Sequence, residues 1–280
     1  MSAQRARSVR GAQVLITGAN RGMGRLFALQ AAAEGASRLV LWGREAESLE
    51  SVAAEARSIE PAVEVEIGVA DLADFLAVDD LVADLLEAGR APDVLINNAG
   101  MVSSNTMAWQ QDPDEAIRTL SVNTVAPIRI SGRLLPAMIA DAPRQKRILN
   151  VASASALTPV PRAAAYAGSK AALAHWSDTL RTELMLAGHT HIAVTTYNPG
   201  FVDTGMFAGT TSIGLTPHLS PERAVEIGWK AMLAGRAETV APSLVHIARG
   251  ARAFLPAPAF DALARSLGVY SSMDTFTGRL

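Results

Sequence analysis

The sequence predicts an α/β fold in which a single parallel sheet carries helices on both faces. Short apolar runs of strand length alternate with helical stretches along most of the chain. No internal repeat, linker or low-complexity block divides the 280 residues, a length within reach of one α/β domain. Hydrophobic residues make up 49% and charged residues 19%, a composition that supports a large core and argues against disorder.

The first third of the chain alternates regularly between the two kinds of element. Strands are expected at 14–17, 39–42, 63–69 and 93–96, each a short apolar run. Helices are expected after the first strand, where Leu26, Leu29 and Ala33 share one face, and then at 45–59 and 75–88. Strands joined by right-handed crossover helices run parallel, which gives a doubly wound sheet.

The remaining elements are longer and less regular. A long helix at 113–139 tolerates Pro127 and Pro136 only with kinks or breaks. A strand at 147–151, a helix at 163–187 and a strand at 192–197 follow. We expect one domain over residues 12–280, with a substrate loop at about 203–220, a helix near 221–233 and an apolar, proline-punctuated extension at about 241–280.

Bulk properties exclude several classes of function. We expect residues 1–11 to form a disordered basic leader. The first apolar run, Val14–Ile16, is only of strand length, so we expect a cytoplasmic protein with no integral membrane segment. The net charge of -2 gives no reason to expect nucleic-acid binding. Cysteine is absent, and the five histidines show no ligand cluster, so no metal site is expected.

A glycine-rich loop lies between the first strand and the first helix. Gly18 permits a tight turn, Gly22 lets the backbone approach a pyrophosphate, and Gly24 allows close packing of helix on sheet. The helix N-terminus then offers free N–H groups to the phosphates. Three glycines alone could be an ordinary turn, but the strand and helix context predicts a dinucleotide site that also includes Asn20, Arg21 and Met23.

Arginines at this site favour NADP as the cofactor. In dinucleotide folds an acidic residue after the second strand holds the ribose hydroxyl, whereas an arginine accommodates a 2′-phosphate. Here that strand ends at Gly43 and Arg44, and Arg21 lies in the glycine loop, so two guanidinium groups could meet one phosphate. Both could instead be solvated surface arginines, in which case NAD remains possible.

A Tyr and a Lys four residues apart form the candidate proton-transfer pair. Tyr166 and Lys170 lie on one face of the expected helix, and an ammonium beside a phenol should lower the pKa of the tyrosine from about 10. Ser153 follows the fifth strand, at the sheet edge where ligands bind, and could donate to a substrate oxygen. Taken alone the pair is common and could be structural; Ser155 is a nearby competitor for Ser153.

These motifs together resemble the short-chain dehydrogenase/reductase family over about residues 14–204. The resemblance rests on the glycine spacing, on Asn97-Asn98-Ala99-Gly100 after the fourth strand, and on Ser153 with Tyr166 and Lys170. It implies a Rossmann-like fold. It also implies that Lys170 binds the nicotinamide ribose and that Asn123 supports a water linking Lys170 to solvent. The further cofactor contacts that it implies are Asp71, Leu72, Asn98, Ala99, Gly100, Pro199, Gly200, Val202 and Thr204. Without the family, Asp71 would read as a helix N-cap and Asn123 as a residue at a helix kink.

The substrate is less constrained by the sequence. Segments at 24–29, 39–42 and 273–279 resemble the retinol and 17β-hydroxysteroid dehydrogenase branch, which implies a lipophilic alcohol or ketone. The branch often carries an acidic residue where this chain has Gly43 and Arg44. Met206 and Phe207 should cover the substrate. Four apolar residues of the extension could line the pocket: Phe254, Leu255, Phe260 and Leu263. They could equally be buried in the core, form an oligomer interface or belong to an interfacial helix.

The leading hypothesis is an NADP(H)-dependent oxidoreductase that interconverts a lipophilic alcohol and its ketone or aldehyde. The resemblance also implies a homodimer or homotetramer built on the helices at 113–139 and 163–187. One rival is a 3-oxoacyl thioester reductase, for which Arg129, Arg133 and Arg162 are candidates to hold a carrier phosphate. A second rival is a non-catalytic NADP-binding regulator, although such proteins usually lose the tyrosine or the lysine.

Overall fold

The computed structural model describes residues 8–211, 213 and 218–278, and its centre is a parallel sheet of seven strands. The strand order is β3-β2-β1-β4-β5-β6-β7, so the order reverses between β1 and β4. The strands are β1 (Gln13–Thr17), β2 (Arg38–Gly43), β3 (Glu64–Val69), β4 (Val94–Asn97), β5 (Lys146–Val151), β6 (Ile192–Pro199) and β7 (Glu238–Ala241). The predicted doubly wound sheet is confirmed, and ligands of such sheets bind at the carboxyl ends of the strands near the reversal.

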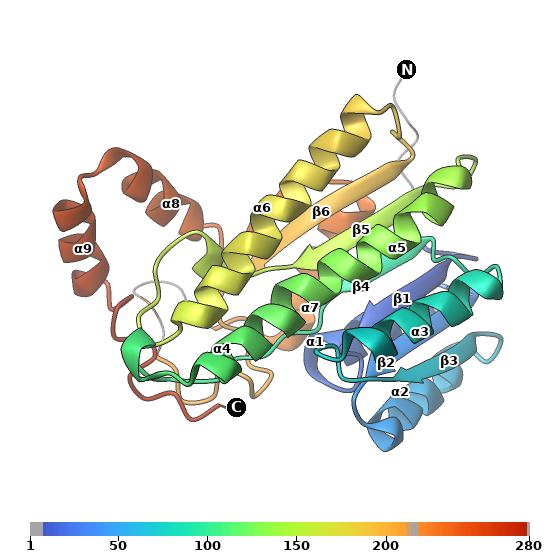
Figure 1. Ribbon diagram of the computed structural model, residues 1–280, viewed down its shortest axis with the longest axis horizontal. Coiled ribbons are helices and arrows are strands. Elements are labelled where there is room, and N and C mark those ends of the chain that lie inside the picture. The colour runs from blue at the N-terminus through green and yellow to red at the C-terminus, as the bar shows by residue number, and fades with distance from the viewer. Residues whose placement is uncertain (1–7, 212, 214–217, 279–280) are drawn as a thin grey trace.

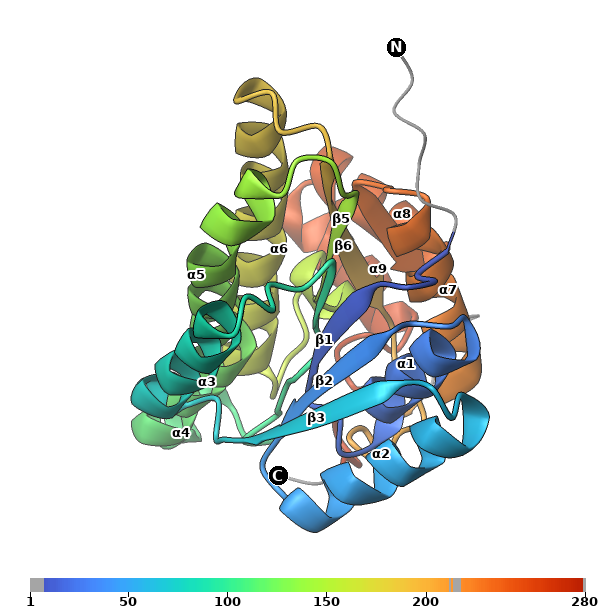
Figure 2. The ribbon, with the colours of Figure 1, turned by 90° about the vertical axis from the view of Figure 1, so that its right-hand side faces the viewer.

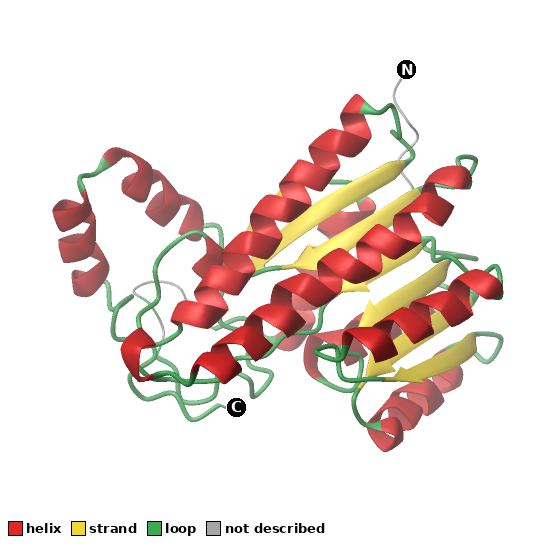
Figure 3. Ribbon diagram, viewed as in Figure 1, coloured by secondary structure: helices red, strands yellow, loops and turns green. Residues whose placement is uncertain are grey.

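Helices cover both faces of the sheet (Figures 1 and 3). One face carries α1 (Gly22–Ala33), α2 (Ala46–Ile59) and α7 (Pro221–Leu233). The other carries α3 (Phe75–Glu87), α4 (Pro113–Leu120), α5 (Ala126–Ala140) and α6 (Ala164–Leu186), as the turned view in Figure 2 makes clear. The last two helices, α8 (Val245–Phe254) and α9 (Ala257–Ser266), project away from the sheet at the left of Figure 1.

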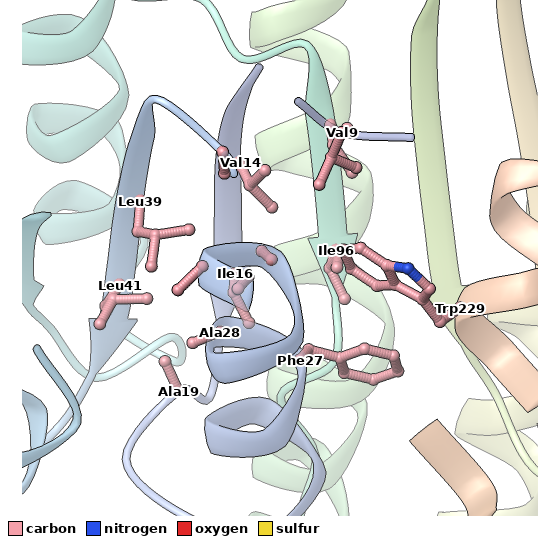
Figure 4. Close-up of a cluster of buried hydrophobic side chains, with 14 of the residues drawn as sticks. Val9, Val14, Ile16, Ala19, Phe27, Ala28, Leu39, Leu41, Ile96 and Trp229 are labelled. Carbon is pink, nitrogen blue, oxygen red and sulfur yellow. The ribbon is translucent and has the colours of Figure 1, made fainter. Parts of the chain in front are cut away.

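Burial on both faces explains why the strands read as continuous apolar runs. Along β1, Val14 and Ile16 pack beneath α1 with Phe27 and Trp229 (Figure 4), whereas Leu15 packs on the opposite face. All three β1 side chains are fully buried, as expected for a central parallel strand.

The predicted long helix is one helical stretch with a π-helical turn inside it. The turn, η2, spans Ser121–Val125 between α4 and α5, and the N–H of Ala126 bonds the carbonyl of Ser121, five residues earlier. Pro127 follows directly and has no N–H to donate to the fourth carbonyl before it, which explains why regular α-helical bonding fails here. Pro136 is accommodated inside α5 without ending it.

Two expectations about the ends of the chain need correction. Residues 1–7 of the expected disordered leader lie outside the described residues, but Val9 is buried in the core and Gly11 donates to the carbonyl of Gly35 at 2.8 Å, so residues 8–11 belong to the fold. Just before the expected extension, the sequence analysis missed β7, because four residues at a sheet edge give no periodic signal. No helix in the described part of the chain is long and apolar enough to span a membrane.

Candidate active site

The carboxyl ends of the strands open into a cleft of about 350 Å³, a size typical of cofactor and small-molecule sites. Most residues that the sequence singled out line it: Gly18, Asn20, Arg21, Gly22, Met23, Arg44, Asp71, Leu72, Asn98, Ala99, Gly100, Tyr166, Lys170, Pro199, Gly200, Val202 and Thr204. Gly24, Asn123 and Ser153 lie outside this lining. The cleft therefore gathers segments that are far apart in the sequence at one edge of the sheet.

The glycine loop is shaped by close backbone contacts. Gly18 has a φ of +67°, and a Cβ there would lie 2.8 Å from the Cα of Ala99. A Cβ on Gly24 would lie 2.1 Å from the carbonyl oxygen of Gly18, so this glycine packs the helix against the loop and does not face the cleft. Asn98 bonds the carbonyl of Thr17 at 3.0 Å, which joins the loop to the end of β4. Any side chain at Gly18 or Gly24 would open this cradle.

The N-terminus of α1 is suited to an anionic group. Its N-cap, Arg21, offers no side-chain acceptor, whereas α3, α4 and α7 are capped by Asp74, Asp112 and Ser220. The N–H groups in the first turn of a helix need acceptors, and the positive end of the helix dipole favours negative charge. The cradle, together with a helix end that no side chain caps, fits the pyrophosphate of a dinucleotide.

Charged side chains surround the end of the cleft near β2 and β3. Arg21 and Arg44 both line it, and Asp71 forms an ion pair with Arg118. Burial opposes ionisation of Asp71, but the N–H of Ala73 and the Arg118 guanidinium outweigh it and lower the pKa of the carboxyl group. The N-cap interpretation of Asp71 is wrong, because Asp74 caps α3.

The sequence reasoning missed several cleft residues. Arg118 and Glu115 come from α4, and Ala70, Met101, Val122, Val151 and Ala152 complete the walls beside the segments already named. An isolated Arg and Glu on an exposed helix carry no sequence signal for a site. Only the tertiary contact between α4 and the end of β3 brings them to the cleft.

Tyr166 lies at the bottom of the cleft and is almost completely buried. Its hydroxyl interacts with the side chain of Ser153, and its ring meets that of Phe207 edge-on at 5.6 Å between centroids. Ser153 is also fixed by the N–H of Ser155, which donates to its Oγ at 3.1 Å. Of the two candidate serines, Ser153 is therefore the one that contacts the phenol.

Burial sets the acidity of both members of the Tyr–Lys pair. It raises the pKa of Tyr166 to about 12, against a smaller opposite effect of the Ser153 hydrogen bond. It lowers the pKa of Lys170 to about 8, and the ammonium donates to the carbonyl of Val151 at 2.8 Å. The expectation that Lys170 lowers the pKa of Tyr166 is wrong for this structure, because desolvation of the phenol dominates.

Asn123 lies behind the cleft wall, in the π-helical turn. Its Oδ1 accepts from the N–H of Met101 at 2.8 Å, and its Nδ2 donates to the carbonyl of Met101 at 2.9 Å and to Ser169 at 3.0 Å. A Cβ added to Gly100 would lie 3.3 Å from the Lys170 ammonium and 3.4 Å from Asn123 Oδ1. Asn123 therefore ties the loop after β4 to α6, next to Lys170.

An apolar cluster closes the side of the cleft beyond Tyr166. It combines Val102, Val160, Ala163, Tyr166, Phe201, Met206, Phe207, Met273 and Phe276. Met206 and Phe207 line the cleft, as predicted for the substrate loop, whereas the contribution of the chain's last residues was not foreseen. The described part of this loop, which excludes residues 212 and 214–217, thus forms an apolar lid over the catalytic candidates.

The last described residues hold this lid in place, and we call residues 272–278 the strap. Thr277 donates its N–H to the carbonyl of Ala208 at 2.8 Å, and the Thr275 hydroxyl donates to the carbonyl of Gly209 at 2.6 Å. The N–H of Thr211 in turn donates to the carbonyl of Ser272 at 3.1 Å. The strap therefore holds residues 208–211 of the substrate loop in place.

The α8–α9 hairpin does not contribute to the cleft. Phe254 is 89% exposed, and Leu255 and Leu263 are about 40% exposed. Phe260 is buried, with the Arg252 guanidinium over its ring, and is not part of the cleft wall. The hypothesis that these four residues line the substrate pocket is wrong.

Both a family model and individual relatives of known name match this chain. The family model for short chain dehydrogenases matches residues 12–212. The chain is 31% identical to estradiol 17-beta-dehydrogenase 11 of Rattus norvegicus over 94% of its own length and 86% of the relative's. It is 32% identical to epidermal retinol dehydrogenase 2 of Homo sapiens over 96% of its own length and 86% of the relative's.

The fold of a solved structure agrees with these relatives. A short-chain dehydrogenase from Sphingobium yanoikuyae, in complex with NADPH, aligns with a TM-score of 0.74 and 28% identity, covering 91% of this chain and 94% of that one. The similarity therefore extends over most of both chains. The chain belongs to the short-chain dehydrogenase family and is an oxidoreductase that acts on alcohols or the corresponding carbonyl compounds.

Proposed function

We propose that this protein is an NADP(H)-dependent oxidoreductase that interconverts a lipophilic alcohol and its ketone or aldehyde. The observation that carries the proposal is the placement of Tyr166 in the cleft wall, with Ser153 and Lys170 beside it and the apolar lid next to it. A phenol and a hydroxyl placed together in this way can hold one substrate oxygen and exchange a proton with it.

Each catalytic candidate then has a defined task. A nicotinamide cofactor held by the glycine loop would supply or accept the hydride. Tyr166 gives the proton to the substrate oxygen in reduction and takes it back in oxidation, while Ser153 orients that oxygen. Lys170, whose pKa of about 8 lets it exchange a proton near neutral pH, maintains the proton path, and Asn123 holds the loop beside it.

Two arginines support NADP over NAD. Arg21 and Arg44 line the end of the cleft where the adenosine half would lie, and both carry exposed side chains free to meet a doubly charged phosphate. Position 43, at the end of β2, bears no carboxylate that could bind a ribose hydroxyl. The similar Sphingobium yanoikuyae enzyme was solved with NADPH.

The apolar lid supports a lipophilic substrate. The ring of Phe207 contacts Tyr166 and lies between those of Phe201 and Phe276, at centroid distances of 5.2 and 6.5 Å and in tilted or edge-on orientations. Such a wall gains free energy by covering apolar substrate surface. Relatives named for estradiol and retinol are consistent with a substrate of this class.

A 3-oxoacyl thioester reductase is less well supported. Arg129 and Arg133 both pair with Asp79 on α3, and Arg162 donates to Asp274 at 2.9 Å. The three arginines proposed to hold a carrier phosphate are thus each already paired with a carboxylate, and Arg129 and Arg133 share one. A non-catalytic NADP-binding regulator is also less well supported, because Ser153, Tyr166 and Lys170 are present together.

Steady-state kinetics with both cofactors tests the proposal. NADPH and NADH are each supplied with steroids, retinoids, alkyl ketones and acyl thioesters. We expect turnover of steroid, retinoid or long-chain carbonyls with NADPH, at a kcat/KM at least tenfold above that with NADH. A higher kcat/KM with NADH, or selective turnover of acyl thioesters, would contradict it.

A further inference from the structure

One side chain of the glycine loop reaches across to the end of β2. The Nδ2 of Asn20 donates to the carbonyl of Glu45 at 2.8 Å, and its Oδ1 accepts the N–H of Arg44 at 3.2 Å. The amide thus closes the turn between β2 and α2 with two hydrogen bonds. The backbone adds a third link, because the N–H of Ala19 donates to the carbonyl of Trp42 at 3.0 Å.

The Asn20 amide also fills the space that a side chain at position 43 would need. A Cβ built on Gly43 would lie 1.8 Å from Asn20 Oδ1 and 2.7 Å from its Cγ. Real Cβ atoms do not approach other atoms this closely, so one of the two groups must move. A free amide could rotate away at little cost, but this amide would first have to give up both of its backbone hydrogen bonds.

Position 43 is where an acidic residue in a dinucleotide fold reaches the adenosine ribose. We propose that Asn20 is a specificity-determining residue for the cofactor. Its amide keeps position 43 free of any side chain, which excludes a ribose-binding carboxylate. The same amide fixes the turn that carries Arg44, so that Arg44 and Arg21 line the same end of the cleft. The inference rests on the proposed preference for NADP.

Specificity in this arrangement arises from exclusion as well as attraction. Arginines alone would attract a 2′-phosphate but would not prevent a carboxylate at position 43 from also binding the ribose of NAD. The Asn20 bridge and a carboxylate at position 43 are mutually exclusive occupants of one space. A change at position 43 should therefore work only when Asn20 is changed as well.

A four-member cycle tests this coupling through binding. The members are the wild type, Asn20→Ala, Gly43→Asp and the double variant. Dissociation constants for NADP⁺, NAD⁺, 2′,5′-ADP and 5′-AMP are measured by calorimetry, and apo unfolding temperatures show whether each variant is folded. We expect Asn20→Ala to weaken 2′,5′-ADP about tenfold, as the loss of two positioning hydrogen bonds implies, and 5′-AMP by less than threefold.

Gly43→Asp alone should weaken 2′,5′-ADP strongly without improving NAD⁺, because the new side chain collides with the Asn20 bridge. The double variant should bind NAD⁺ at least tenfold more tightly than the product of the single changes predicts. Effects on NAD⁺ that multiply to within twofold would overturn the inference.

Ser37→Ala is the matched control. Ser37 lies before the opposite end of β2 and also bonds two backbone carbonyls, those of Gly11 at 3.0 Å and Ala12 at 3.2 Å. Its loss should lower the unfolding temperature and leave the ratio of 2′,5′-ADP to 5′-AMP affinity unchanged. A change of that ratio in Ser37→Ala equal to the change in Asn20→Ala would also overturn the inference.

A wild type that binds 5′-AMP as tightly as 2′,5′-ADP would refute the proposed NADP preference itself, whereas multiplicative effects in an NADP-preferring enzyme refute only the role of Asn20.

Discussion

The two halves of the cleft are built in different ways. The half around the glycine loop is assembled from residues at the ends of neighbouring strands, and short backbone contacts such as that between Gly24 and Gly18 fix it. The half around Tyr166 depends on contacts across the whole chain, since the strap residues Met273 and Phe276 pack with Phe207 from a loop more than 60 residues earlier. The first half can be reused for the same cofactor with any substrate. We expect changes in the strap to affect the second half more than the first.

The largest effect should come from the residue at which the two halves meet. Tyr166→Phe removes the hydroxyl that Ser153 contacts, and the loss of a positioned general acid lowers kcat by about 10²- to 10⁴-fold. The dissociation constant for NADP⁺ should change by less than threefold, because the glycine loop remains intact. Steady-state kinetics and calorimetry on the same preparation measure both quantities.

Tyr197→Phe provides the control for that experiment. Tyr197 is a second fully buried tyrosine, whose pKa burial also raises, and its hydroxyl has no hydrogen-bond partner among the described residues. Because it does not line the cleft, its hydroxyl should be dispensable for turnover. Equal losses of kcat in the two variants would mean that burial of a phenol, and not its place beside Ser153, matters.

The buried ammonium should leave a pH signature in stability. Burial lowers the pKa of Lys170 from 10.5 to about 8, so between these values the unfolded chain binds more protons than the folded one. Stability due to this group therefore rises with pH across that window. We expect Lys170→Met to be more stable than the wild type at pH 7, by up to about 3 kcal/mol, with the difference shrinking as pH approaches 10.5.

Denaturant unfolding of the apo proteins at pH 7, 9 and 10 measures this difference. Tyr166 titrates at a raised pKa in both proteins, so its destabilising effect above pH 10 cancels in the comparison. A difference between Lys170→Met and the wild type that stays constant from pH 7 to 10 would show that the ammonium is not desolvated.

The contrast between the halves also explains what could be predicted from the sequence. Gly18, Gly22 and Lys170 belong to motifs with fixed spacing, and all three line the cleft. The strap and the cleft residue Arg118 have no such spacing, because their place depends on tertiary packing. Phe254 and Phe276 look alike in a sequence, yet one is 89% and the other 9% exposed. The predicted direction of the Tyr166 pKa shift was wrong for the same reason, since desolvation is a property of the folded environment.

The smallest effect should separate the strap from the loop that it holds. Gly209 has a φ of +78°, and a Cβ there would lie 2.3 Å from the carbonyl oxygen of Thr275. Gly205 has a similar φ of +85° but nothing within 4 Å, so Gly205→Ala reproduces the backbone strain without touching the strap. We expect Gly209→Ala to raise KM for a lipophilic substrate about fivefold more than Gly205→Ala does, with equal affinity for NADP⁺ in the two variants. Equal KM values would mean that the substrate loop keeps its shape without the strap, and that the two halves differ less than their contacts suggest.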